Sequence, residues 1–154
     1  MAHTYRASQT ADASEEAAWI TLSDFDGYAA WNPLTPAVRG APAFGATVVL
    51  QVAFGGWTFP LRATIVRLQP GELAWRVAWP LGLIQAIRMQ RTFRHDDGRT
   101  EIETTETIGG WLSPLVHALF GPTLRDAMTR WAQAAAARAH EVDRRLTHIV
   151  TEPG

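Results

Sequence analysis

The sequence predicts one α+β domain, in which antiparallel strands are followed by a long C-terminal helix. Between residues 48 and 108, runs of strand-type composition are separated by turn signals that contain Gly or Pro. From Ser113 to about Thr147 the apolar residues recur at helical spacing instead. Because 154 residues suffice for one domain with a substantial core, we assign residues 1–154 to a single domain.

A strand and a helix are expected at the N-terminus. Residues 3–10 form a candidate first strand, whose one bulky anchor is Tyr5. Asp12 and Glu15 have the spacing of a capping box, in which two side chains satisfy free backbone N–H groups at a helix start. This pattern predicts a helix that runs to about Ser23.

The segment from Trp19 to Pro33 is the most informative part of the chain. Trp19 and Leu22 lie at helical spacing and continue the apolar stripe of the first helix. Tyr28 and Trp31, three residues apart, share one face of a second short helix. Asn32-Pro33 ends this helix, because a proline pushes the residue before it out of the α region.

The remaining elements follow from turn signals and periodicity. Five further strands are expected, at residues 48–54, 57–68, 73–79, 84–95 and 100–108. Gly55-Gly56, Pro70-Gly71 and the segment from Asp96 to Arg99 provide turns between them. Gly121-Pro122 predicts a break between a short helical segment and the long terminal helix.

A two-residue turn at Asp97-Gly98 would fix the register of the last hairpin. It sets Phe93 opposite Ile102 and Arg91 opposite Thr104, and opposed residues share one face of a sheet. The apolar face, which we expect to point to the core or a cavity, then holds Ile87, Met89, Phe93, Ile102 and Ile108. The opposite face, expected in solvent, holds Arg88, Gln90, Thr92, Arg94, Glu101, Glu103, Thr105 and Thr107.

Three polar residues fall on the apolar face in this register. Arg91 opposes Thr104 and lies diagonal to Glu106, within reach of a long side chain. An unpaired charge there would be costly, so Arg91 and Glu106 should form an ion pair or share a water. The pair is either a structural anchor of the sheet or a polar handle inside a ligand pocket.

The order of elements and two motifs resemble the SRPBCC superfamily, which includes START-like and polyketide-cyclase-like proteins. The motifs are Trp31-Asn32-Pro33 and the strand ending Thr100 … Glu106-Thr107-Ile108-Gly109, with Ile108 where an aromatic residue is usual. The resemblance implies the helix-grip fold of the birch-pollen allergen. In this fold a curved antiparallel sheet of about six to seven strands surrounds a long C-terminal helix, and two short helices after the first strand close one end of a cavity.

Composition removes several classes of function. The chain has no cysteine and its fourteen basic residues are all arginine, which excludes thiolate chemistry and lysine Schiff bases. The net charge of −1 gives no electrostatic footprint for nucleic acid. No apolar run is long enough for a membrane span and the N-terminus lacks an apolar core of a signal peptide. We therefore expect a bacterial, cytoplasmic protein without nucleic-acid or integral membrane association; a homodimer is compatible with the sequence.

The histidines lack metal-site spacing, so no metal or other cofactor is expected. His117 is the most interesting of them, because the resemblance brings its segment across the cavity mouth. A structural histidine there remains the alternative to a catalytic one.

The resemblance implies binding or transport of a hydrophobic small molecule, such as a lipid, quinone, polyketide or aromatic metabolite, in a cavity between the sheet and the C-terminal helix. Aromatic walls with few polar groups suit such a site. The residues expected to line it are Tyr28, Trp31, Trp75, Met89, Arg91, Phe93, Thr104, Glu106, Trp111, His117, Met128 and Trp131.

Two other functions remain open on the sequence. An enzyme of the polyketide cyclase/dehydratase type would use Glu106, Arg91 or His117 as acid, base or oxyanion partner. A co-chaperone-like interaction module would use the outer sheet or the apolar loops. Binding without chemistry is favoured, because no set of nucleophile, base and orienting group can be assembled from the sequence.

Overall fold

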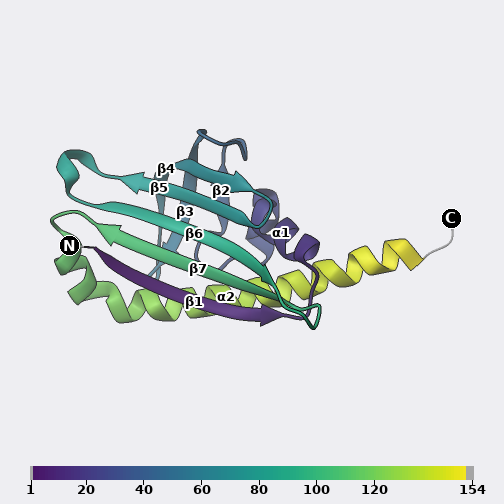
Figure 1. Cartoon of the computed structure of the whole chain (residues 1–154). Helices are drawn as coiled ribbons and strands as arrows, with labels where there is room; N and C mark the ends of the chain where they lie inside the picture. Colours follow the sequence, from purple (N-terminus) through teal and green to yellow (C-terminus); the bar gives the residue numbers. More distant parts are fainter. Residues whose placement is uncertain (1, 152–154) are drawn as a thin grey trace.

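The computed structural model describes residues 2–151, which form one curved antiparallel sheet around a long helix (Figure 1). In chain order the elements are β1 (His3–Ala11), α1 (Glu15–Ser23), the 3₁₀ helix η1 (Phe25–Ala30), β2 (Ala37–Arg39), β3 (Thr47–Phe54), β4 (Trp57–Gln69), β5 (Glu72–Ala78), the 3₁₀ turn η2 (Pro80–Gly82), β6 (Gln85–Arg94), β7 (Thr100–Gly109) and α2 (Ser113–Thr151). The predicted α+β helix-grip fold is confirmed.

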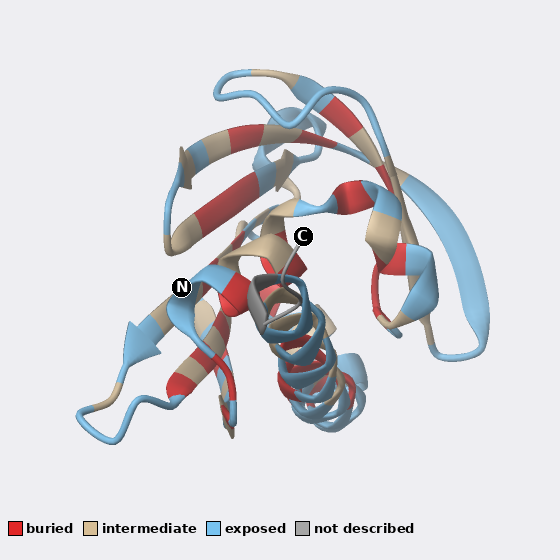
Figure 2. Cartoon of the chain, turned by 90° about the vertical axis from the view of Figure 1, so that its right-hand side faces the viewer, coloured by how far each residue is buried: buried red, intermediate tan, exposed pale blue. Residues whose placement is uncertain are grey.

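The sheet has seven strands in the order β1-β7-β6-β5-β4-β3-β2. Every neighbouring pair is antiparallel, and the first strand closes onto the last one. Figure 2 looks along α2 from its C-terminal end and shows the sheet curving over the helix. The helix packs mainly against β1 and α1 and less closely against β7. The inner face of β3 to β6 is therefore the part of the sheet that α2 covers least.

Two local expectations about the helices were wrong. The cap of α1 is Ser14, whose hydroxyl accepts a hydrogen bond from the Ala17 N–H at 3.2 Å, in place of the predicted box that began at Asp12. Pro122 lies inside a continuous α2 and does not divide it. A proline removes one intrahelical hydrogen bond, and Pro122 lies on the exposed side of the helix.

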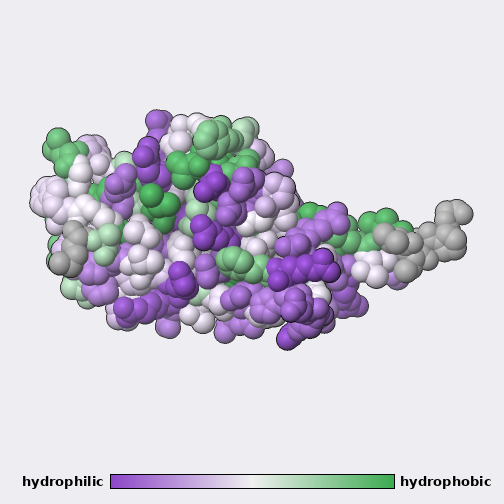
Figure 3. All heavy atoms as spheres, in the orientation of Figure 1, coloured by the Kyte–Doolittle hydropathy of each residue, from purple (hydrophilic) through white to green (hydrophobic). Residues whose placement is uncertain are grey.

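The core between α1, α2 and β7 is rich in alanine. Ala17 and Ala18 of α1 and Ala135 of α2 are fully buried, and these small side chains let the two helices approach closely. Trp131 fills the space next to them and is 1 % exposed. The last turns of α2 extend beyond the sheet (Figure 1). On the face seen in Figure 3, hydrophilic and hydrophobic groups are interspersed.

The predicted register of the β6–β7 hairpin was wrong by one residue. The loop has three residues, Asp96 to Gly98, with the Gly98 N–H bonded to the His95 carbonyl at 3.1 Å and the His95 N–H to the Arg99 carbonyl at 2.8 Å. Gly98 has a φ of 84°, the left-handed conformation that a three-residue hairpin loop needs at its last position. Arg94 therefore opposes Thr100, and Thr92 opposes Ile102.

A shift of one residue exchanges the two faces of β6, because side chains alternate along a strand. On β7 the prediction was right: Ile102 and Thr104 are fully buried and Ile108 is nearly so. On β6 it was reversed, since Arg88 and Gln90 are buried while Phe93 and Ile87 are exposed. Glu101 and Glu103, predicted in solvent, are half-buried.

Paired truncations on β6 and β7 test this register. Ile102→Ala should lower the free energy of unfolding by about 2–5 kcal/mol, because it leaves a cavity in the core. Phe93→Ala should cost less than about 1 kcal/mol, since the ring is 42 % exposed. Chemical denaturation of both variants gives the comparison. A larger loss from Phe93→Ala than from Ile102→Ala would contradict the register.

Candidate functional site

The register brings a row of large and polar side chains together on the inner face of the sheet. Trp75 of β5 opposes Arg88, Arg88 opposes Glu106 of β7, and Glu106 opposes Tyr5 of β1. Opposed residues of neighbouring strands point to the same side. Gln90 and Thr104 form the next row in the same way. A polar band therefore crosses the concave face between aromatic residues.

Arg88 and Glu106 form an ion pair in this band. Arg88 Nε lies 3.3 Å from Glu106 Oε2 and donates a hydrogen bond of 3.2 Å to Thr104 Oγ1. The guanidinium carbon lies 5.9 Å from the ring centre of Trp131 on α2. The Arg88 side chain is 7 % exposed and that of Glu106 is 17 % exposed. The pair is thus nearly enclosed, with the carboxylate as its more accessible member.

Burial shapes the protonation of both groups. Desolvation raises the pKa of Glu106, and the nearby Arg88 charge opposes that shift. Desolvation lowers the pKa of Arg88, which the Glu106 charge opposes in turn, and the guanidinium keeps its proton. Burial also raises the pKa of Tyr28, whose hydroxyl donates to the Leu22 carbonyl. A carboxyl with a raised pKa can act as an acid or a base nearer neutral pH than a free one.

Three buried polar atoms of this band have no hydrogen-bond partner among the described residues. They are Nη2 of Arg88 and both Nε2 and Oε1 of Gln90. Gln90 is only 1 % exposed. Buried amide and guanidinium groups are almost always hydrogen-bonded in folded proteins, because leaving one unpaired costs about 1–3 kcal/mol. Within the described chain, these three atoms are therefore the unused hydrogen-bonding capacity of the band.

At the other end of the row, Tyr5 meets the start of α2. The Tyr5 hydroxyl and His117 Nδ1 are 2.5 Å apart, and the His117 ring stacks on His3 with centroids 4.0 Å apart. The Arg125 guanidinium carbon lies 5.5 Å from the Tyr5 ring centre. Desolvation, followed by His3 and Arg125, lowers the pKa of His117. His117 is thus held neutral beside a buried phenol.

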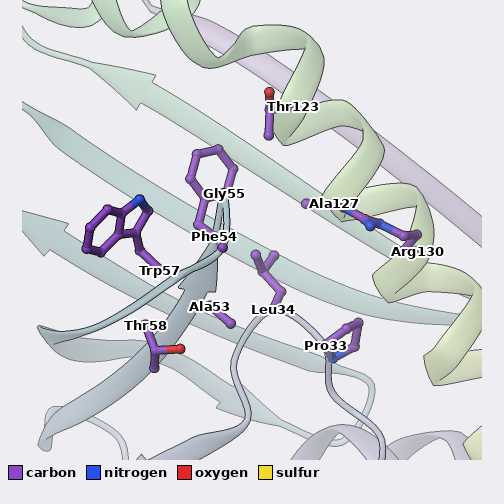
Figure 4. A pocket seen from close by; sticks show the side chains of 11 residues that line it. Pro33, Leu34, Ala53, Phe54, Gly55, Trp57, Thr58, Thr123, Ala127 and Arg130 are labelled. Carbon is purple, nitrogen blue, oxygen red and sulfur yellow. The ribbon is translucent and has the colours of Figure 1, made fainter.

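A pocket of about 340 Å³ opens between the β3–β4 hairpin and α2. Its walls include Phe54 and Trp57 of the hairpin, Leu34, and Ala127 and Arg130 of α2 (Figure 4). This volume is at the lower end of the range for small-molecule sites. The Phe54 ring also contacts Phe120 of α2 with centroids 5.9 Å apart, which joins the hairpin tip to the helix.

The pocket and the polar band both lie near the same part of α2. Ala127, one turn before Trp131 on the same face of α2, lines the pocket, while Arg88 lies against the Trp131 ring. The Trp31 ring packs on Trp131 with centroids 5.8 Å apart. Trp131 therefore packs between Trp31 and Arg88, one helical turn from the residue that lines the pocket.

The residues predicted to line a cavity fall into three groups. Those on the inner face or on the elements that cover it are Tyr28, Trp31, Trp75, Thr104, Glu106, Met128 and Trp131. Two lie near the start of α2. His117, in its first turns, is half-buried, and Trp111, in the turn before the helix, is 67 % exposed with its indole N–H donating to the Leu81 carbonyl at 3.2 Å.

The third group, Met89, Arg91 and Phe93, lies on the outer face of β6, and the prediction that it points to the cavity was wrong. The three-residue loop turns these residues outward. Arg91 consequently pairs with Glu72, Nε to Oε1 3.7 Å, and not with Glu106. Its place beside Glu106 is taken by Arg88.

Sequence reasoning therefore missed Arg88, Gln90 and Tyr5 as site residues. The first two were assigned to solvent because of their polarity and the assumed turn. Asp96-Asp97-Gly98 also fits a three-residue loop with glycine in the left-handed position. With a three-residue loop, the sequence would have placed the polar residues Arg88 and Gln90 on the inner face of their strand.

The family is identified by sequence comparison. The family model described as polyketide cyclase / dehydrase and lipid transport matches residues 2–144. The chain belongs to this family. It lies within the SRPBCC superfamily, as the Trp-Asn-Pro and strand-end motifs suggested. Among curated proteins, none matches the chain.

Solved structures with the same fold share little sequence with this family member. The ZhuI aromatase/cyclase from Streptomyces sp. R1128 superposes with a TM-score of 0.76 at 18% identity, covering 95% of this chain and 96% of that one. A START superfamily protein from Mycobacterium smegmatis gives 0.65 at 16%, covering 94% and 99%. Ara h 8.0201 gives 0.66 at 11%, covering 92% and 99%. At these identities the likeness establishes the fold alone.

Two absences within the described chain bear on the site. Within residues 2–151, no group of three or more His, Asp or Glu side chains is arranged to hold a metal ion. No helix in that part of the chain has both the length and the apolar character that a membrane span needs.

The ion pair of the site makes a thermodynamic prediction. Arg88→Met alone should lower the free energy of unfolding by about 3–5 kcal/mol, because it leaves Glu106 buried without its partner. The double variant Arg88→Met/Glu106→Leu should recover most of that loss, since apolar residues replace both charges. Denaturation of the single and double variants measures the coupling.

The outer pair Arg91–Glu72 is a matched control for this cycle. Its side chains are 40 % and 28 % exposed, so its coupling should be about 0–1 kcal/mol. Equal coupling energies in the two cycles would show that Arg88 and Glu106 are solvated, contrary to the structure.

The lowered pKa of His117 predicts a pH effect on stability. The usual pKa of a histidine, about 6.5, applies in the unfolded chain. As the pH falls, the unfolded chain therefore takes up this proton at a higher pH than the folded protein does. Stability is therefore lost as the pH falls from about 6.5 toward the lower folded pKa. Thermal melting of His117→Gln should depend less on pH between 7 and 5 than melting of the wild type or of the exposed-site control His148→Gln. Identical slopes for all three proteins would refute this assignment.

Proposed function

We propose that this protein binds a hydrophobic small molecule between the sheet and α2, with the polar end of the molecule at Arg88 and Gln90. The observation that carries the proposal is the set of unpartnered buried atoms on the inner face. A structural ion pair would need only Arg88 and Glu106. The Gln90 amide makes no hydrogen bond to the described residues, so hydrogen bonding gives it no structural role. A ligand's oxygen or nitrogen atoms would satisfy it.

The surroundings of the polar band suit an apolar body. Tyr28, Trp75 and Trp131 are each at most 4 % exposed and stand around Arg88, so a ligand there would lie against aromatic surface. Most of the affinity of such a ligand would come from apolar burial, at about 25 cal/mol per Å². The pocket beside Phe54 and Ala127 opens to solvent one helical turn along α2 from Trp131. Lipid transport is among the activities in the family's description, which supports carriage.

Native mass spectrometry tests this proposal without requiring that the ligand be identified first. Protein purified from its own host is sprayed under native conditions, and its mass is compared before and after extraction with organic solvent. A co-purified small molecule that the solvent releases is the expected result. Apo protein that also fails to bind a panel of hydrophobic probes would refute the proposal and favour an interaction module.

A second candidate function is catalysis of the cyclase/dehydratase type. It is favoured by Glu106, a carboxyl with a raised pKa that lies beside a guanidinium and opposite the Tyr5–His117 pair. Such a carboxyl could remove a proton from carbon next to a carbonyl group, with Arg88 stabilising the resulting oxyanion.

Glu106→Gln separates the two functions. The change keeps the size of the side chain and one acceptor oxygen but removes its charge and its acid/base capacity. For a carrier, ligand affinity should change by less than about tenfold. For an enzyme, turnover should fall by about 10²–10⁴-fold while binding is retained. We expect the carrier result, measured by quenching of tryptophan fluorescence for affinity and by product analysis for turnover. Turnover that disappears in Glu106→Gln would contradict it.

A further inference from the structure

The polar band has a charge balance that restricts the ligand. Arg88 and Glu106 supply one positive and one negative charge, and they already neutralise each other. The other members that face the same space, Gln90 and Thr104, carry no charge. Among the described residues close by, Arg125 lies outside the band over the Tyr5 ring and is exposed. The band formed by Arg88, Gln90, Thr104 and Glu106 therefore carries no net charge when the ion pair is formed.

The donors and acceptors of the site that lack a partner within the described chain also restrict the ligand. Arg88 Nη2 and Gln90 Nε2 are donors without an acceptor, and Gln90 Oε1 is an acceptor without a donor. Gln90 follows Arg88 by two residues on the same strand, so the groups face the same side. The complementary ligand group has an acceptor for the two N–H groups and a donor for the amide oxygen.

A carboxylate fits this site poorly. It would bring a second negative charge beside Glu106 with only one guanidinium to balance the two. Two carboxylates sharing one enclosed site cannot both stay ionised without cost, so binding would require Glu106 to take up a proton. A plain hydrocarbon fits poorly for a different reason, because it would leave the Gln90 amide unpaired.

We propose that Arg88, Gln90 and Glu106 form a subsite that selects an uncharged ligand with a carbonyl oxygen and a hydroxyl group, over fatty-acid-type carboxylates and plain hydrocarbons. This inference rests on the proposed binding function and adds the chemical class of the ligand. The carbonyl oxygen accepts from Arg88 Nη2 and Gln90 Nε2. The hydroxyl group donates to Gln90 Oε1, and the Arg88–Glu106 pair stays intact.

The test uses three naphthalene probes of similar size. They are 2-(hydroxyacetyl)naphthalene, its isomer 2-naphthylacetic acid and 2-ethylnaphthalene, and their affinities are measured by equilibrium dialysis at pH 7. The uncharged hydroxyketone should bind at least about tenfold more tightly than the carboxylate, a ratio that corresponds to about 1.4 kcal/mol. The ratio should shrink as the pH is lowered, because proton uptake then favours the carboxylate.

A variant locates the preference at Gln90. Gln90→Met keeps the length of the side chain but removes both amide functions. It should weaken binding of the hydroxyketone by about tenfold or more and leave 2-ethylnaphthalene unchanged or tighter. Gln85→Met, an exposed glutamine on the same strand, is the control and should alter neither. Circular dichroism verifies that both variants fold, and the comparison of probes on the wild-type protein needs no variant.

The outcomes separate this inference from the proposed function. Tight binding of 2-ethylnaphthalene with equal affinities for the carboxylate and the hydroxyketone would overturn the inference and leave a hydrophobic binding function in place. An equal loss for the hydroxyketone and the hydrocarbon in Gln90→Met would overturn it as well. Binding of none of the probes would count against the proposed function itself, and the subsite would fall with it.

Discussion

The site depends on the three-residue loop that joins β6 and β7. Because Asp96 to Gly98 form the loop, β6 pairs with β7 so that Arg88 and Gln90 share a face with Thr104 and Glu106. A loop shorter by one residue would turn both outward and bring Met89 and Phe93 inside. Which side chains of β6 face the interior, Arg88 and Gln90 or Met89, Arg91 and Phe93, is thus set by a turn at one end of the sheet.

Polar groups in that interior can be tolerated because each charge has a partner and the surrounding core supplies stability. Alanine-rich contacts between α1 and α2 bury the helices tightly, whereas α2 covers the inner face of β3 to β6 less closely. Trp131, Arg88 and the pocket beside Ala127 lie where α2 covers the sheet less closely. The contacts of α2 that stabilise the fold are thus distinct from those beside the pocket and the polar band.

The sequence predicted the architecture better than the site. Element order, the Trp-Asn-Pro turn and the alternation of β7 are local patterns, and local patterns identified the fold and one face of the hairpin. The partner of Glu106 was not local. It depended on whether the turn held two or three residues, and Asp96-Asp97-Gly98 is compatible with both. Tyr5 was recognised as an anchor, but its bond to His117 joins residues that are 112 positions apart in the chain.

Cysteine scanning of β6 tests the central claim most directly, because the chain has no cysteine of its own. Each residue from Ile87 to Phe93 is replaced in turn, and the rate of reaction with a water-soluble thiol reagent is measured under native conditions. The structure predicts rapid modification at positions 87, 89, 91 and 93 and slow modification at 88, 90 and 92. The opposite alternation, with protection at 89, 91 and 93, would return Arg88 and Gln90 to solvent and contradict the account.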